Sequence, residues 1–157
     1  MIRNKRTFEY FNKFIKDGDF LLDVGCRDGA LREYLKDKKK INYYGIDPCV
    51  ETKDEYTKTI IEIYETQYRY GIIAMSHVLE HTKSPYIALK NAKDLLEPDG
   101  KILLAVPNIY TFKFLQVITL NLKNYPKGNI GHYQEFTKME MENLCRDLGL
   151  KITHYKP

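Results

Sequence analysis

The sequence predicts a doubly wound α/β domain, in which a mostly parallel sheet carries helices on both faces. Short apolar runs rich in Ile, Leu and Val alternate along the chain with stretches of helical periodicity. These runs are almost continuously apolar, which is typical of strands buried on both faces of a sheet. The length of 157 residues suits one domain spanning 1–157.

The elements of the first half follow from periodicity and from the residues that interrupt it. Apolar residues at helical spacing predict the helices, and compact apolar runs bounded by Gly, Asp or Pro predict the strands. In chain order, these elements are a helix at 8–15, a strand at 20–24, a helix at 31–35, a strand at 43–46 and a weaker third strand at 59–64.

Helix caps and turn residues mark the elements of the second half. Ser84-Pro85 and the Thr137/Glu140 capping box each predict a helix start, while Pro98-Asp99-Gly100 and Gly149 each predict a helix end. The predicted strands of this half lie at 72–75, 102–106 and 151–155.

Composition excludes several classes of protein. The chain is 43% hydrophobic and 13% aromatic, which excludes a disordered chain. Its net charge of +4 is too small to predict a specific nucleic-acid partner. The three cysteines, Cys26, Cys49 and Cys145, form no C-x-x-C pair, so no disulfide framework is expected. Because the first residues lack the apolar core of a signal peptide, we expect a cytoplasmic protein.

Two glycines follow the first predicted strand, in the run LDVGCRDG at 22–29. Gly25 and Gly29 permit a tight turn and the close approach of a ligand to the backbone before a helix N-terminus. Arg27 stands where the G-x-G-x-x-G dinucleotide fingerprint has its second glycine, so an NAD-linked enzyme is a remote alternative.

Asp47 ends the second predicted strand, 22 residues after Gly25. An acidic side chain at this place can accept hydrogen bonds from both hydroxyls of an adenosine ribose. The alternative role is a turn aspartate before Pro48. Together with the glycine loop, the ribose role is favoured.

The run SHVLEHT follows the fourth predicted strand, at 76–82. His77, Glu80 and His81 match the H-x-x-E-H pattern, in which two histidines bind zinc beside a glutamate base. That chemistry requires the motif to lie within a helix, whereas here a strand enters it directly and Ser84-Pro85 starts a new helix just afterwards. A zinc hydrolase therefore stays a minor alternative, and no metal ligand is assigned.

Four segments, in this order, resemble class I S-adenosylmethionine-dependent methyltransferases, most closely the small-molecule enzymes related to ubiquinone and menaquinone biosynthesis. They are DVGCRDG at 23–29, YYGIDP at 43–48, IIAMSHVLEHTKSPYIALKNAKDLLEPDGKILLAVPN at 72–108 and GHYQEFTKMEMENLCRDLGL at 131–150. The resemblance implies a three-layer Rossmann-like fold, a small-molecule acceptor, and S-adenosylmethionine as cofactor with S-adenosylhomocysteine as product. The family sheet has seven strands, so this chain is expected to lack the last antiparallel strand or to close its sheet differently.

The resemblance also implies site residues. The loop after the first strand would hold the methionine part of the cofactor, Asp47 and Pro48 the ribose and adenine edge, and the loop after the fourth strand the region near the transferred methyl. Glu62 is a weak candidate for the adenine amine. The cofactor-binding residues implied in this way are Asp23, Gly25, Cys26, Gly29, Asp47, Pro48, Ser76, His77 and Val78.

A hydroxyl or amine acceptor must lose a proton during methyl transfer, and histidine suits that task because it titrates near neutral pH. His77 and His132 are the predicted catalytic residues, with His81 a further candidate. Each of these histidines has the alternative of a structural role.

The stretch 109–130 is apolar around most of a helix and has no place in the minimal fold. We expect a helix buried against the sheet or against a second copy of the chain; the alternatives are a lid over the acceptor or a membrane-surface contact through 109–122. No membrane span is expected. A catalytically idle cofactor-binding module that acts through partners is the leading alternative function, because of Arg27 and the missing strand.

Overall fold

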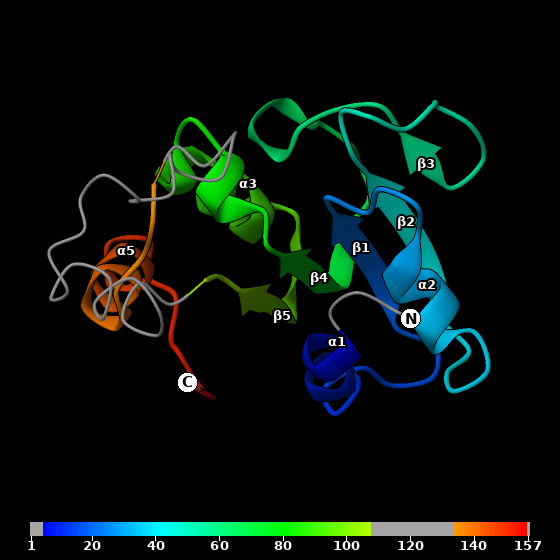
Figure 1. Ribbon diagram of the computed structural model, residues 1–157, viewed down its shortest axis with the longest axis horizontal. Coiled ribbons are helices and arrows are strands. Elements are labelled where there is room, and N and C mark those ends of the chain that lie inside the picture. Colours follow the sequence, from blue (N-terminus) through cyan, green and yellow to red (C-terminus); the bar gives the residue numbers. More distant parts are fainter. Residues whose placement is uncertain (1–4, 108–133, 157) are drawn as a thin grey trace, which may run out of the picture.

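The computed structural model describes residues 5–107 and 134–156, and these residues build the predicted layers around one sheet. The sheet has five parallel strands in the order β3-β2-β1-β4-β5 (Figure 1). The strands are β1 (Phe20–Val24), β2 (Asn42–Ile46), β3 (Tyr56–Thr57), β4 (Tyr70–Ser76) and β5 (Leu96–Ala105). The predicted doubly wound α/β class is confirmed, and within the described residues no antiparallel strand joins this sheet.

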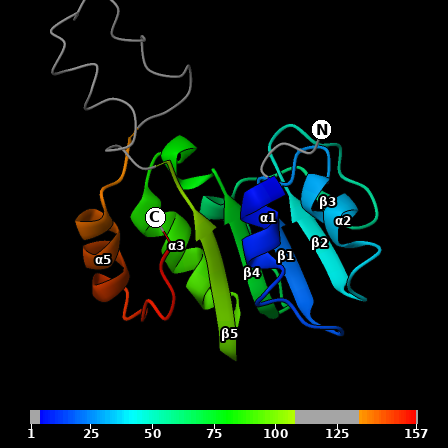
Figure 2. The same ribbon diagram turned by 60° about the horizontal axis from the view of Figure 1, so that its bottom comes forward.

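Helices cover both faces of the sheet. Figures 1 and 2 show α1 and α2 on one face, α3 on the other, and α5 beyond β5. The helices are α1 (Lys5–Phe11), α2 (Ala30–Leu35), α3 (Pro85–Asp94) and α5 (Lys138–Asp147), with the short 3-10 turns η1 (Ile61–Ile63) and η2 (Leu79–His81).

Successive residues of the central strands pack into opposite halves of the core. Leu21 and Ile72 pack with the apolar residues of α1 and α2, whereas Leu22 and Ile73 pack with those of α3. All four side chains are at most 3% exposed. Burial on both faces explains why the strands are continuously apolar in sequence.

Both predicted helix starts in the second half are confirmed. The Ser84 hydroxyl accepts a hydrogen bond from the backbone N–H of Ile87, and Pro85 occupies the first turn of α3. At α5, the side chains of Thr137 and Glu140 each accept from the other's backbone N–H, as a capping box requires.

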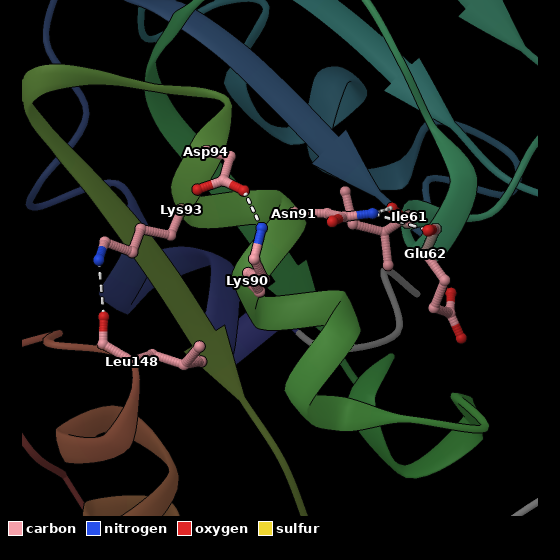
Figure 3. A network of polar contacts seen from close by, with 7 residues as sticks. All are labelled: Ile61, Glu62, Lys90, Asn91, Lys93, Asp94 and Leu148. Carbon is pink, nitrogen blue, oxygen red and sulfur yellow. Dashed lines mark hydrogen bonds and ion pairs between the residues drawn. The ribbon is translucent and has the colours of Figure 1, made fainter.

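The prediction of a third strand at 59–64 is wrong. The strand at this edge is the two-residue β3, and the predicted segment instead contains η1. The Asn91 amide of α3 donates to the carbonyl oxygens of Ile61 at 3.2 Å and of Glu62 at 2.7 Å (Figure 3). These two hydrogen bonds attach η1 to α3.

The fifth strand begins earlier than predicted. The preceding helix ends at Asp94, and β5 starts at Leu96, which pairs with Tyr70. The next pair is Ile72 with Lys101, so residues 97–100 bulge out of the ladder. The prediction that Pro98-Asp99-Gly100 ends the helix is therefore wrong, because this turn lies inside β5 and the helix already ends at Asp94.

The predicted sixth strand at 151–155 is also wrong. Residues 151–156 are exposed and form no strand, so they add nothing to the edge of β5. The His154 ring instead packs against the Phe14 ring at 4.8 Å, and the Lys156 amine lies 5.5 Å from the Tyr10 ring centre. Contacts with the chain around α1 thus replace the predicted pairing.

Several sequence predictions concern residues outside the described part. These are the cap at 109–130, the surface contact at 109–122 and the candidate base His132. Of the helices in the described ranges, none has both the length and the apolar character needed to cross a membrane.

Candidate functional site

Three loops meet at one edge of the sheet because β1 pairs in parallel with both β2 and β4. The carboxyl ends of parallel strands lie together, and ligands of such sheets bind beyond those ends. Gly25, Asp47 and His77 each directly follow one of these three strands. The structure therefore brings together the loops from which the sequence predicted a cofactor site.

The glycine loop after β1 depends on its two glycines for close packing. Gly25 has φ 73°, and a Cβ there would lie 2.6 Å from the Cγ2 methyl of Val78. Gly29 also has φ 73°, and its Cβ would lie 2.7 Å from the Tyr56 hydroxyl. Both positions favour glycine through backbone conformation and space, and Gly25 lets the β4 loop pack directly against the β1 loop.

Asp47 is a buried carboxylate, 4% exposed, whose orientation is fixed by two backbone donors. One oxygen accepts from the N–H of Arg27 at 3.1 Å, and the other accepts from the N–H of Cys49 at 2.7 Å. The glycine loop itself thus holds this side chain. Each carboxylate oxygen retains a lone pair for a further donor.

Arg27 follows the backbone path that glycine would take at this position. Its φ is 45°, in the left-handed region, and the residue is exposed. The neighbouring Asp28 is also exposed. The loop keeps its turn with arginine at this position, and the side chain is exposed to solvent.

Asp23, the predicted acid of β1, lies buried beneath the loop at 4% exposure. The Tyr43 hydroxyl donates to its Oδ2 at 2.8 Å. Burial raises the pKa of Asp23 to about 7; the Tyr43 hydrogen bond opposes this rise, and the charge of Asp47 adds to it. Near neutral pH this carboxyl is therefore poised between its neutral and charged forms.

Cys26 is also buried, at 4% exposure. Burial raises the pKa of its thiol to about 12, and the negative charges of Asp23 and Asp47 add to the rise. A neutral thiol is a poor nucleophile, so Cys26 acts in this loop through packing. Its sulfur lies 2.8 Å from the place a Cβ would take at Gly45, which shows how closely β2 and the loop approach.

The loop after β4 contains the predicted residues Ser76, His77 and Val78. The Ser76 hydroxyl is buried and has no hydrogen-bond partner among the described residues. His77 has φ 57°, and its N–H donates to the Ala105 carbonyl of β5 at 2.9 Å. A non-glycine residue in this conformation is strained, and such strain is frequent at functional sites.

The zinc interpretation receives no support from this loop. Residues 79–81 form a single 3-10 turn, so the spacing of His77, Glu80 and His81 does not act as it would in an α-helix. Across 5–107 and 134–156, no group of three or more His, Cys, Asp or Glu residues is placed to hold a metal ion. Instead, His77 Nδ1 lies 3.2 Å from Glu80 Oε1.

Sequence reasoning missed the partners of several predicted residues. The Tyr43 hydroxyl donates to Asp23, and the Glu80 carboxyl lies against the His77 ring. The Tyr56 hydroxyl lies where a Cβ at Gly29 would need space. Only Glu80 was signalled by a motif, and then in a metal-binding role. The weak adenine candidate Glu62 is engaged through its backbone carbonyl, which accepts from Asn91.

The sequence of this chain is similar to those of known methyltransferases. The chain is 32% identical to (S)-coclaurine N-methyltransferase of Papaver somniferum over 101 residues, which cover 55% of this chain and 29% of that protein. It is 26% identical to ubiquinone biosynthesis O-methyltransferase of Haemophilus ducreyi over 163 aligned positions, covering 88% of this chain and 68% of that protein.

A solved structure shows the same fold. The 1,6-didemethyltoxoflavin-N1-methyltransferase of Burkholderia thailandensis, crystallised with 1,6-didemethyltoxoflavin and S-adenosylhomocysteine, superposes with a TM-score of 0.66 at 16% identity. The alignment covers 92% of this chain and 65% of that one. The chain thus spans from under a third to about two thirds of the length of these proteins. The family model described as a methyltransferase domain matches residues 3–155. The chain therefore belongs to the methyltransferase domain family.

Proposed function

We propose that this chain binds S-adenosylmethionine and transfers its methyl group to a small-molecule acceptor. The observation that carries the proposal is the buried Asp47 carboxylate, which the N–H of Arg27 in the glycine loop holds in place. A carboxylate oriented in this way beside a glycine turn suits the two hydroxyls of a ribose. S-Adenosylhomocysteine bound to the Burkholderia enzyme is consistent with this choice of cofactor.

The residues at this edge fit such a cofactor. Asp47 keeps acceptor capacity, and Ser76 presents a buried hydroxyl without a partner among the described residues. Gly25 has no side chain and the Cys26 side chain is buried, so a ligand can approach the backbone at the start of this loop. These groups, with Gly29, Pro48 and Val78 at the rim, would hold the adenosine and methionine parts, and Asp23 would act from beneath the loop.

The bound cofactor would supply the electrophilic methyl group. The chain would align the acceptor and accept its proton, if the acceptor is a hydroxyl or an amine. His77 suits the role of base because its side chain is 39% exposed at the carboxyl edge of the sheet. His132, the second candidate, lies outside the described residues.

A hollow of about 430 Å³ lies beside the start of α3 and is large enough for a small acceptor. Lys83, Tyr86 and Gln134 are among the residues that line it. The Gln134 amide donates to the carbonyl of Thr82, which ties the segment before α5 to the end of the β4 loop. The hollow thus borders the segment that follows the β4 loop, and none of Asp47, Ser76 and His77 lines it.

Calorimetric titration of the full chain with S-adenosylhomocysteine tests cofactor binding. Asp47→Asn should weaken binding by about 10- to 100-fold, since a hydrogen bond to a charged group contributes about 1.5–3 kcal/mol. Asp37→Asn, an exposed carboxylate at the end of α2, is the matched control and should bind as the parent chain does. Absence of binding by the folded parent chain would remove the proposal.

The catalytic step has a separate test. Release of S-adenosylhomocysteine is measured with a panel of phenols and amines as acceptors. His77→Gln should lower kcat by about 10²–10⁴-fold, as expected for loss of a general base, and should weaken the binding of S-adenosylhomocysteine far less than it lowers kcat. Equal kcat in parent and variant would exclude His77 as the base.

A further inference from the structure

Glu80 is a buried carboxyl group to which the proposed function gives no role. Its side chain is 1% exposed, and its Oε1 lies 3.2 Å from His77 Nδ1. Its second oxygen, Oε2, is buried and has no hydrogen-bond partner among the described residues. Burying a carboxyl group costs several kcal/mol unless it is paired, so the contact with His77 is its main polar compensation in the described part of the chain.

His77 is held at both its backbone and its ring. The hydrogen bond from its N–H to Ala105 and its left-handed φ of 57° fix the backbone at the end of β4. The contact with Glu80, three residues later in η2, fixes the ring. The pair is buried at its carboxyl end and open at its imidazole end, with exposures of 1% and 39%.

This geometry has a consequence for the tautomer of the ring. An ionised carboxylate only accepts hydrogen bonds, so the nitrogen that faces it must carry a hydrogen. In the neutral imidazole, a hydrogen on Nδ1 leaves Nε2 without one. Nε2 then has a lone pair that can accept a proton.

We propose that Glu80 is a positioning residue that holds His77 in its Nδ1–H tautomer and leaves Nε2 as the proton acceptor of the site. The proton would pass from an O–H or N–H of the methyl acceptor to Nε2, and the Glu80 carboxylate would stabilise the imidazolium that forms. The acceptor of this site is thus a protic nucleophile. The inference rests on the proposed function for the role of His77 as base, but the tautomer does not depend on it.

Long-range ¹H–¹⁵N correlation spectra of the ¹⁵N-labelled full chain report the tautomer directly. At about pH 9, above the ordinary titration range of imidazole near 6.5, each ring shows which nitrogen carries the hydrogen. The chain has only four histidines, so the His77→Gln spectrum assigns the signals of His77. We expect a protonated Nδ1 and an unprotonated Nε2; a hydrogen on Nε2 in the parent chain would overturn the proposal.

Two substitutions of Glu80 separate hydrogen bonding from packing. Glu80→Gln keeps an acceptor oxygen of nearly the same shape and should retain the Nδ1–H tautomer, whereas Glu80→Leu should yield a mixture of both tautomers. His154, which is exposed and distant from Glu80 in sequence, is the control within each spectrum and should not change. An unchanged His77 tautomer in Glu80→Leu would also refute the assignment.

Titration with S-adenosylhomocysteine distinguishes the two proposals. If the parent chain fails to bind it while His77 shows the Nδ1–H tautomer, the proposed function fails and the positioning of His77 by Glu80 stands. If binding is normal and the Nε2–H tautomer is found, only the positioning role fails. Should Glu80→Leu not fold, the parent spectrum and Glu80→Gln still decide the tautomer.

Discussion

The buried carboxyl of Asp23 makes stability depend on pH in a direction opposite to that of an ordinary salt-bridged aspartate. Its pKa is raised from 3.8 to about 7 in the folded chain, so between these values the native state binds a proton that the unfolded state has released. The free energy of unfolding therefore falls as pH rises through this window. A rise of about three pKa units corresponds to about 4 kcal/mol over the whole range.

Asp23→Asn isolates this contribution. The amide cannot ionise, and its oxygen can still accept from the Tyr43 hydroxyl that bonds Asp23 at 2.8 Å. From about pH 5 to about pH 8.5, the parent chain should lose about 3 kcal/mol of stability relative to the variant, because pH 5 lies roughly two pH units below the folded-state pKa.

Urea unfolding followed by circular dichroism at several pH values measures this difference. The exposed carboxylate Asp37 supplies the control, because Asp37→Asn should differ from the parent chain by a nearly constant amount across the range. If the difference between the parent chain and Asp23→Asn does not vary with pH, the carboxyl is not held neutral by burial, and the reasoning is refuted.

Three further predictions concern packing and reactivity. Gly25→Ala should destabilise the chain by about 1–2 kcal/mol more than Gly18→Ala in urea unfolding. Both glycines have positive φ, but a Cβ at Gly25 would meet Val78, whereas a Cβ at Gly18 meets nothing within 4 Å. Equal costs would contradict the contact between Gly25 and the β4 loop. Asn91→Ala should lower the free energy of unfolding by about 1–3 kcal/mol, because two hydrogen bonds to η1 are lost (Figure 3). Lys90→Ala breaks an exposed ion pair and should lower it by at most about 1 kcal/mol in the same assay. Similar costs would refute the bridging role of the Asn91 amide. The Cys26 thiol, with its pKa raised to about 12, should resist a thiol reagent at about pH 8 until denaturant is added, as peptide mapping by mass spectrometry would show; rapid labelling of the folded chain would contradict its burial.

Local sequence determined the elements whose signals lie within a few residues. The compact run of β1, the Ser84 cap and Pro85 at the start of α3, and the capping box at the start of α5 all act through neighbouring residues, so the structure reproduces them. The sequence also determined the edge at which the site lies. Strands that alternate with helices favour a parallel sheet, and the residues that follow parallel strands meet at one edge.

The tertiary structure alone decided where hydrogen bonds and burial act between distant segments. Residues 59–64 carry a strand-like pattern, but they contain η1, and the side-chain amide of Asn91 donates hydrogen bonds to the carbonyls of Ile61 and Glu62. Tyr43 meets Asp23 across twenty residues, and the environment of that carboxyl, not its identity, raises its pKa. Glu80 stood within the zinc pattern, and only the 3-10 turn shows that its carboxyl faces His77 instead of a metal. Periodicity determines which residues are buried, but the partners of a buried polar group are set by contacts that a linear pattern does not contain.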